Sequence, residues 1–347
     1  MTQKSTRAEA DETSKKTGDA VLKDGTWGPI TIGEVTVEPG TRARINMPMS
    51  RLPTGTEMGL PVIVVRGSSP GPSVWLSAAL HGDELNGIEI VRSVLERIDP
   101  ESFAGTLLAI PVVNIFGFLN ESRYTPDRRD LNRSFPGRPR GSLASRVAHL
   151  FMNEIVSRCD YGVDLHTGSD YRTNLPQIRG NMRDKLTFDL ARAFSAPVMM
   201  HTKNREGTLR KAATKLGKKV LLFEGGEPMR LDEQVIQVGR EGILRVFDFL
   251  KMRDYDMPPI QVNSLFVGRT SWVRARRAGV LRLFRKMGDI VEKGEELGAI
   301  EDILGNQTTQ MKSTCHGVII GLGLNPIVYQ GDAVIHIARL DMDDEEE

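Results

Sequence analysis

The stretch SVWLSAALHGDELNGIEIVRSVLERID, residues 73–99, joins an apolar run to an amphipathic segment through a short polar turn. Residues 73–80 are apolar at nearly every position, which is typical of a strand covered on both faces of a sheet. Residues 86–99 instead place their apolar side chains at helical spacing. The stretch therefore predicts a strand, a turn and a helix, the repeating unit of an α/β fold.

The same alternation of short apolar runs and amphipathic segments continues to about residue 255. It predicts an α/β fold in which helices flank a mixed, mostly parallel sheet. We expect strands at residues 61–67, 73–80, 106–114, 161–166 and 218–226, and helices at residues 86–99, 142–159, 182–195 and 232–251.

The pattern of apolar and glycine residues changes after Pro258 and Pro259. Short strand-like runs now alternate with glycine turns at close intervals, which indicates a small all-β domain. We therefore divide the chain into a disordered polar tail (1–24), an α/β domain (25–257), a β-barrel or β-sandwich domain (258–340) and an acidic tail (341–347).

Composition excludes several functional classes. Lys and Arg (46) nearly balance Asp and Glu (45), whereas a nucleic-acid-binding protein usually has a basic excess. No apolar run is long enough for a membrane span, and none opens the chain as a signal peptide. The two cysteines, Cys159 and Cys315, lie far apart, so we expect no disulfide framework and a cytoplasmic location. A metal site would therefore use histidine and carboxylate ligands.

Three predicted strands end in side chains that can bind a metal or carry a proton. Residues 73–80 lead into His81, with Glu84 three positions later, and two other strands end at His166 and Glu224. The carboxyl ends of parallel strands meet at one edge of a sheet. Two imidazoles and one carboxylate make the open site of a zinc hydrolase, so we expect one Zn²⁺ per chain on His81, Glu84 and His166. Glu224 is then the candidate proton carrier.

An arginine-rich segment, residues 121–141, lies between the first two of these strand ends. Its prolines and glycines disfavour regular structure, and arginine can bind a carboxylate or stabilise an oxyanion. We interpret the segment as a substrate-binding loop. The charged cluster PDRRD (126–130) within it is expected to be solvated surface.

Four motifs occur in a characteristic order: HGDE (81–84), RDLNRSFPG (129–137), VDLHTG (163–168) and FEGG (223–226). The set resembles the succinylglutamate desuccinylase/aspartoacylase family, which is related to the zinc carboxypeptidases, over roughly residues 30–340.

The resemblance implies a zinc-exopeptidase-like sheet and a role for each matching residue. His81, Glu84 and His166 would hold zinc, and Glu224 would act first as general base and then as acid. Asn132 and Arg133 would bind the substrate. An arginine upstream of DLNR would lie near the scissile carbonyl. We assign it to Arg123, with Arg128 or Arg129 as alternatives because the spacing differs.

The region after residue 260 is similar to biotinyl/lipoyl-type domains. The corresponding attachment turn, EDILGNQ (301–307), has no lysine. We therefore expect a domain that carries no biotinyl or lipoyl group. The resemblance to related hydrolases, which have a β-domain at this end, implies that it packs beside the entrance of the site.

Together these observations predict zinc-dependent hydrolysis of an amide bond in a small, anionic N-acyl amino acid. One alternative is a metallo-carboxypeptidase that trims peptide C-termini, and another is a binding protein with a vestigial metal site. The expected partner is a small anionic amide, not a nucleic acid or a membrane. A homo-oligomer is compatible with the sequence.

Overall fold

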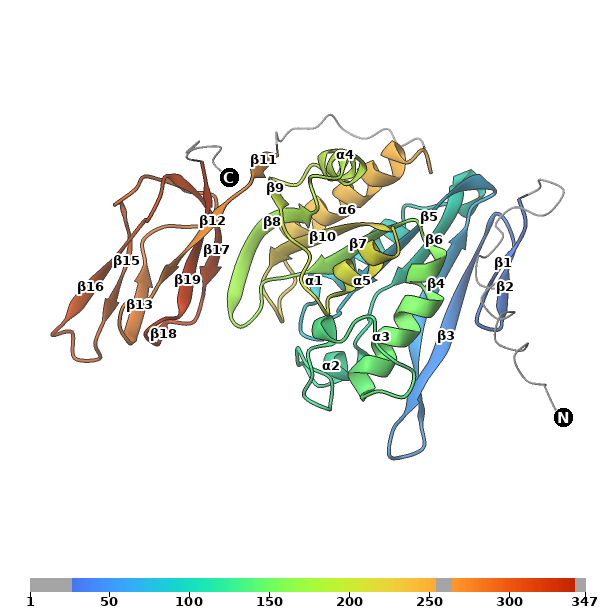
Figure 1. The fold of residues 1–347 in the computed structure, drawn as a ribbon, viewed down its shortest axis with the longest axis horizontal. Coiled ribbons are helices and arrows are strands. Elements are labelled where there is room, and N and C mark those ends of the chain that lie inside the picture. Colours follow the sequence, from blue (N-terminus) through green and yellow to red (C-terminus); the bar gives the residue numbers. More distant parts are fainter. Residues whose placement is uncertain (1–26, 254–263, 341–347) are drawn as a thin grey trace, which may run out of the picture.

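The computed structural model describes residues 27–253 and 264–340 (Figure 1). The predicted polar tail lies outside these ranges, as does the acidic tail. The predicted domain boundary at 257–258 lies in the undescribed stretch between them, so these three assignments stay predictions.

Nineteen strands and six α-helices are assigned in the described residues. The helices are α1 (Asn86–Leu95), α2 (Ile115–Leu119), α3 (Leu143–Glu154), α4 (Lys185–Phe194), α5 (Leu209–Lys215) and α6 (Glu233–Phe249). The strands before the undescribed linker are β1 (Ile30–Ile32), β2 (Val35–Val37), β3 (Thr41–Arg51), β4 (Glu57–Arg66), β5 (Ser69–Ala78), β6 (Ala104–Ile110), β7 (Tyr161–His166), β8 (Arg172–Gly180), β9 (Val198–His201) and β10 (Lys219–Gly226). The strands after it are β11 (Leu265–Val267), β12 (Thr270–Arg274), β13 (Gly279–Leu283), β14 (Ile290–Val291), β15 (Glu296–Glu301), β16 (Thr308–Lys312), β17 (Gly317–Gly323), β18 (Ile327–Val328) and β19 (Ala333–Arg339).

The central sheet is mixed, with parallel strands at its middle. Strands β6, β5, β7 and β10 are neighbours and run parallel. Antiparallel strands extend the sheet on both sides, β4 and β3 beyond β6, and β8 beyond β10. The predicted α/β fold with flanking helices is confirmed. Because β5, β7 and β10 are parallel, their carboxyl ends lie at one edge.

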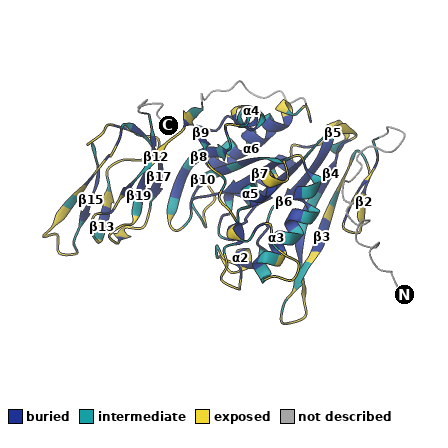
Figure 2. Ribbon diagram, in the orientation of Figure 1, coloured by how far each residue is buried: buried dark blue, intermediate teal, exposed yellow. Residues whose placement is uncertain are grey.

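Helices cover both faces of this sheet (Figures 1 and 2). Helices α1, α4 and α6 pack on one face, and α3 and α5 pack on the other. Strand β5 contributes to both cores, since Val74 and Leu76 belong to the first and Trp75 belongs to the second. This burial on both faces explains why the strand is apolar at consecutive positions.

The C-terminal region is a two-layered antiparallel β structure around its own core, which confirms the predicted all-β character. Strands β16, β15, β13 and β18 form one layer. The other layer contains β12, β19 and β17, and it continues into the central sheet because β17 pairs with β8. The two regions therefore share one sheet, which the sequence did not predict.

None of the helices in the described ranges has both the length and the apolar content needed to span a membrane.

Candidate active site

The turn after β5 places two side chains over the sheet edge. Ala79 has a φ of +46°, a rare value for a residue with a side chain, and turns the chain out of the strand just before His81. Helix α1 then begins at Asn86. A Cβ on Gly87 would lie 2.8 Å from the Cβ of Ala78. Glycine at this position therefore lets the first turn of α1 pack directly on β5 and hold the preceding turn in place.

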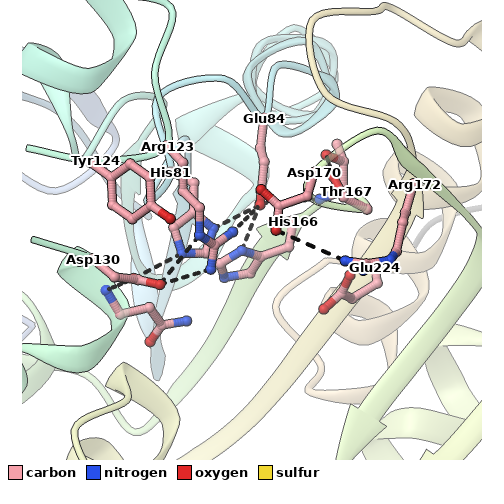
Figure 3. Close-up of polar contacts among 12 residues, drawn as sticks. His81, Glu84, Arg123, Tyr124, Asp130, His166, Thr167, Asp170, Arg172 and Glu224 are labelled. Carbon is pink, nitrogen blue, oxygen red and sulfur yellow. Dashed lines mark hydrogen bonds and ion pairs between the residues drawn. The ribbon is translucent and has the colours of Figure 1, made fainter. Parts of the chain in front are cut away.

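Three buried side chains converge at this edge. The Nδ1 atom of His81 lies 2.7 Å from Oε1 of Glu84, and Nδ1 of His166 lies 2.8 Å from Oε2 of the same carboxylate. Figure 3 shows both imidazoles directed toward Glu84. In the residues that the structure describes, these three form the one group of at least three His, Cys, Asp or Glu side chains with ligand atoms close enough to share a metal ion.

A further carboxylate contacts the remote nitrogen of each imidazole. Nε2 of His166 lies 2.9 Å from Asp164, which also accepts a hydrogen bond from Ser77. Nε2 of His81 lies 3.2 Å from Asp130. A metal-binding histidine usually has such a partner, which fixes its tautomer and ring orientation. Asp164 is thus placed to orient His166.

The electrostatics of the group favour positive charge between its carboxylates. Burial of His166 alone would lower the pKa of its imidazole, but Asp164 and Glu84 outweigh burial and raise that pKa well above its usual value. The pKa of His81 is raised in the same way, by Glu84 and Asp130 against burial. The pKa of Glu84 is lowered, because the two imidazoles outweigh its burial. A divalent cation would supply the same positive charge.

Arg123 is the arginine of the loop that reaches this group. Its Nη1 atom lies 3.3 Å from Glu84, and its Nη2 atom donates to Asp130 at 2.9 Å. Arg128 and Arg129, the alternatives from the sequence, are exposed. The structure therefore singles out Arg123 as the loop arginine beside the candidate metal ligands.

Glu224 lies at the same sheet edge, one strand away. It is the last residue of β10 to pair with β7, and its register partner there is His166. Its carboxylate accepts hydrogen bonds from Asn174 at 2.8 Å and from Arg179 at 3.1 Å. Glu224 thus lies beside His166 on the neighbouring strand (Figure 3), and its carboxylate is held by two residues of β8.

Comparison with known proteins agrees with this geometry. The sequence model of the succinylglutamate desuccinylase/aspartoacylase catalytic domain matches residues 70–250. The chain belongs to this family. The predicted resemblance is confirmed, and the match spans the strand ends that carry His81, His166 and Glu224.

Individual relatives of the succinylglutamate desuccinylase/aspartoacylase family resemble this chain along most of its length. The N-alpha-acetyl-L-2,4-diaminobutyric acid deacetylase of Halomonas elongata is 26% identical over 296 residues, which cover 81% of this chain and 86% of the relative. A succinylglutamate desuccinylase/aspartoacylase structure from Rhodobacter sphaeroides is 25% identical, with a TM-score of 0.79 and coverage of 90% of this chain and 100% of the other.

A structure of the ectoine utilization protein EutE (DoeB) from Ruegeria pomeroyi is 24% identical and has a TM-score of 0.77. The superposition covers 86% of this chain and 94% of that protein, and it supports the shared fold. The Halomonas elongata relative is a deacetylase by its name, which agrees with the hydrolase class predicted for this chain.

Asn132 and Arg133, the predicted substrate-binding residues, lie on a short 3₁₀ turn, Leu131–Arg133, directly after Asp130, which contacts the candidate ligand His81. The side-chain oxygen of Asn132 accepts the backbone N–H of Leu209 at 3.0 Å, so this oxygen anchors the start of α5. Arg133 is exposed and donates to the backbone oxygen of Asn132 at 2.6 Å. This leaves the amide nitrogen of Asn132 and the exposed guanidinium of Arg133 as side-chain donors of the turn.

The interpretation of PDRRD as solvated surface was wrong for Asp130. Its carboxylate contacts His81 and Arg123 and accepts the backbone N–H of Asn132. The contacts with His81 and Arg123 outweigh partial burial and lower the pKa of Asp130. A charge pattern does not distinguish a solvated carboxylate from a partly buried one. The one sequence signal for a role of Asp130 in the site was its place directly before the LNR motif.

Asp130→Ala is expected to weaken zinc binding by about 10- to 100-fold, the usual effect of losing the outer partner of a ligating histidine. The substitution leaves Nε2 of His81 without its acceptor. Asp130→Asn is the matched control, because its side-chain oxygen can still accept the imidazole N–H, and a smaller loss is expected. Competition of each variant with a zinc chelator measures the affinity. Equal affinities for Asp130→Ala and the unsubstituted protein would remove Asp130 from this role.

Proposed function

We propose that this protein is a zinc-dependent amidohydrolase that removes the acyl group from a small N-acyl amino acid. The observation that carries the proposal is the meeting of His81, Glu84 and His166 at one sheet edge, with Glu224 on the adjacent strand. The cytoplasmic location expected from the sequence stays a prediction.

The donor set fits zinc. It combines two imidazole nitrogens with one carboxylate, and three protein ligands leave a coordination position open, as in catalytic zinc sites. Each imidazole has its other nitrogen on a carboxylate, Asp164 or Asp130, which is the support that a ligating histidine needs. When bound, zinc would supply Lewis-acid polarisation of the amide carbonyl and acidification of water.

The chain's own residues account for proton transfer and charge stabilisation. The carboxylate of Glu224 takes a proton from the water whose oxygen attacks the amide carbon, and later delivers it to the leaving nitrogen. The C–N bond then breaks, and a carboxylic acid and an amine are formed. Arg123 presents a guanidinium beside Glu84, where it would stabilise the developing oxyanion.

The proposed substrate is a free N-acyl amino acid with an anionic group. The Halomonas elongata relative is, by its name, a deacetylase of such a compound. Partial burial lowers the pKa of Arg133, and the guanidinium groups of Arg205 and Arg123 add to this effect while Asp130 opposes it. A substrate anion at this place would offset the repulsion among the three guanidinium groups. We assign the substrate carboxylate to Arg133, with the amide nitrogen of Asn132 beside it.

Arg133→Lys is expected to lower kcat/KM for an anionic substrate by about 1.5–3 kcal/mol, the range for a hydrogen bond to a charged group. Lysine keeps the charge but loses the planar pair of donors, so the change is not conservative at a bidentate site. Steady-state kinetics measure the effect, with Arg140→Lys, an exposed arginine of the same loop, as control. An unchanged kcat/KM would exclude Arg133 from anion recognition.

An amine-release screen tests the proposed function as a whole. The zinc-loaded protein is given N-acetyl-L-2,4-diaminobutyric acid, other N-acetyl and N-succinyl amino acids, and short peptides. Release of an amine from at least one N-acyl amino acid is expected. Cleavage of peptides alone would favour the carboxypeptidase alternative, and full zinc content without any turnover would favour the binding protein.

A further inference from the structure

Both oxygens of the Glu224 carboxylate are held by side chains of β8. Nδ2 of Asn174 donates to Oε2 at 2.8 Å, and Nη1 of Arg179 donates to Oε1 at 3.1 Å. The side chains of Arg179 and Glu224 are 24% and 15% exposed, so the ion pair is largely shielded from solvent. Neither Asn174 nor Arg179 belongs to the four motifs that identify the family in this sequence. Both carboxylate oxygens are therefore held by residues to which the family motifs assign no role.

The C-terminal region supports both donors. Gln177 is fully buried, accepts a hydrogen bond from Nε of Arg179 at 3.2 Å and donates to the backbone oxygen of Ile320 at 3.4 Å. Gly321 of β17 is the register partner of Asn174. A Cβ on Gly321 would lie 2.9 Å from Oδ1 of Asn174, so glycine leaves that side chain just enough room. Strand β17 thus contacts the supports of Glu224 at two points.

We propose that Asn174 and Arg179 are positioning residues for the carboxylate of Glu224, and that strand β17 braces them through Gln177 and Gly321. The inference rests on the proposed function, because it takes Glu224 as the general base. It gives the C-terminal region a role in proton transfer, besides the predicted place beside the entrance. A substitution that removes this support from the Glu224 carboxylate should therefore reduce kcat more than it changes KM.

The physical argument is geometric and electrostatic. A general base must present one lone pair to the proton that it removes, and an error of about 1 Å in a catalytic group can cost ~100-fold in rate. Two donors on different oxygens prevent the carboxylate from rotating. The guanidinium of Arg179 also places a positive charge beside this carboxylate. Two further charged or titratable groups lie near this ion pair: His166 on β7 is the register partner of Glu224, and the guanidinium of Arg210 on α5 interacts with the Glu224 carboxylate. On the other side, His336 on β19 interacts with Arg179.

Asn174→Asp tests the electrostatic part. It replaces a donor by a carboxylate of the same shape, 2.8 Å from Oε2 of Glu224. Two carboxylates at this distance do not both ionise readily, so protonation of the pair extends to higher pH. Since a base acts in its ionised form, the acid limb of the kcat–pH profile is expected to move up by about one to three pH units. Activity at neutral pH should fall about 10- to 100-fold and recover in alkaline buffer, with unchanged zinc content.

Gly321→Ala tests the brace from the C-terminal region. The added methyl group would displace the end of the Asn174 side chain, and about a tenfold fall in kcat is expected, with KM and zinc content little changed. Gly323→Ala on the same strand is the matched control, because the nearest atom to its Cβ, the backbone oxygen of Val334, lies 3.5 Å away. Neither glycine has a positive φ, so alanine strains neither backbone.

The outcomes separate this inference from the proposed function. The substrate is N-acetyl-L-2,4-diaminobutyric acid, or the N-acyl amino acid that the zinc-loaded enzyme cleaves fastest. An unchanged acid limb in Asn174→Asp, or equal kcat values for Gly321→Ala and Gly323→Ala, would overturn the inference while Glu224 could remain the base. If no substrate is cleaved, the proposed function fails, and crystal structures still decide the positioning. A Glu224 carboxylate displaced in Gly321→Ala supports the brace, and an undisplaced one overturns it.

Discussion

Glu224→Gln is expected to lower kcat by at least about 100-fold, the scale usual for the loss of a general base. Glutamine keeps the size and shape of the side chain, and its single oxygen can still accept a hydrogen bond from Asn174 or from Arg179. It cannot take a proton from water at neutral pH. Zinc content and substrate affinity should therefore stay near those of the unsubstituted enzyme, because binding and proton transfer use different groups.

Stopped or continuous amine-release assays give kcat, and elemental analysis gives the zinc content. Glu227→Gln is the matched control, since Glu227 lies three residues further along and its side chain is 32% exposed beside Arg230. It should keep full activity. Loss of zinc from Glu224→Gln would show that Glu224 is a metal ligand, and the roles assigned here would be wrong.

His166→Ala is expected to remove most of the bound zinc and essentially all turnover. The imidazole is one of the three candidate ligands found in the described residues, and its loss also leaves the buried Asp164 carboxylate without its imidazole partner. An unpaired buried carboxylate is costly, so a lower melting temperature should accompany the loss of metal. The effect on activity should exceed that of Glu224→Gln, because zinc and its chemistry are lost together.

Elemental analysis of His166→Ala and His81→Ala measures the metal directly. His149→Ala serves as control, because His149 lies on α3 and contacts Asn153 instead of the cluster. The control should retain its zinc. Full zinc in both His81→Ala and His166→Ala would refute the assigned ligand set.

The sequence predicted those parts of the fold and site that depend on local pattern. The strand predicted at 161–166 matches β7, because Val163 and Leu165 fill two of its buried positions and its last residue is the polar His166. The helix predicted at 86–99 ends earlier, at Leu95, although the helical spacing continues. The edge that gathers His81, His166 and Glu224 followed from parallel pairing alone, since the carboxyl ends of such strands coincide.

The parts that the sequence did not predict depend on contacts between distant residues. Strand β8 has no clear alternation, because Asn174, Gln177 and Arg179 are polar residues that serve Glu224 and β17. Its pairing with β17 joins residues more than a hundred positions apart, and no local pattern encodes that register. Asp130 looked like surface charge for the same reason, since its partner His81 lies 49 residues away.

The most direct test of the central claim is amine release before and after removal of zinc. The purified protein is assayed with N-acetyl-L-2,4-diaminobutyric acid and the other N-acyl amino acids, then stripped with a chelator, and then reconstituted with one equivalent of Zn²⁺. The account predicts that the stripped protein releases no amine and that one zinc ion per chain restores the rate. Equal amine release by the stripped and the reconstituted protein would contradict it.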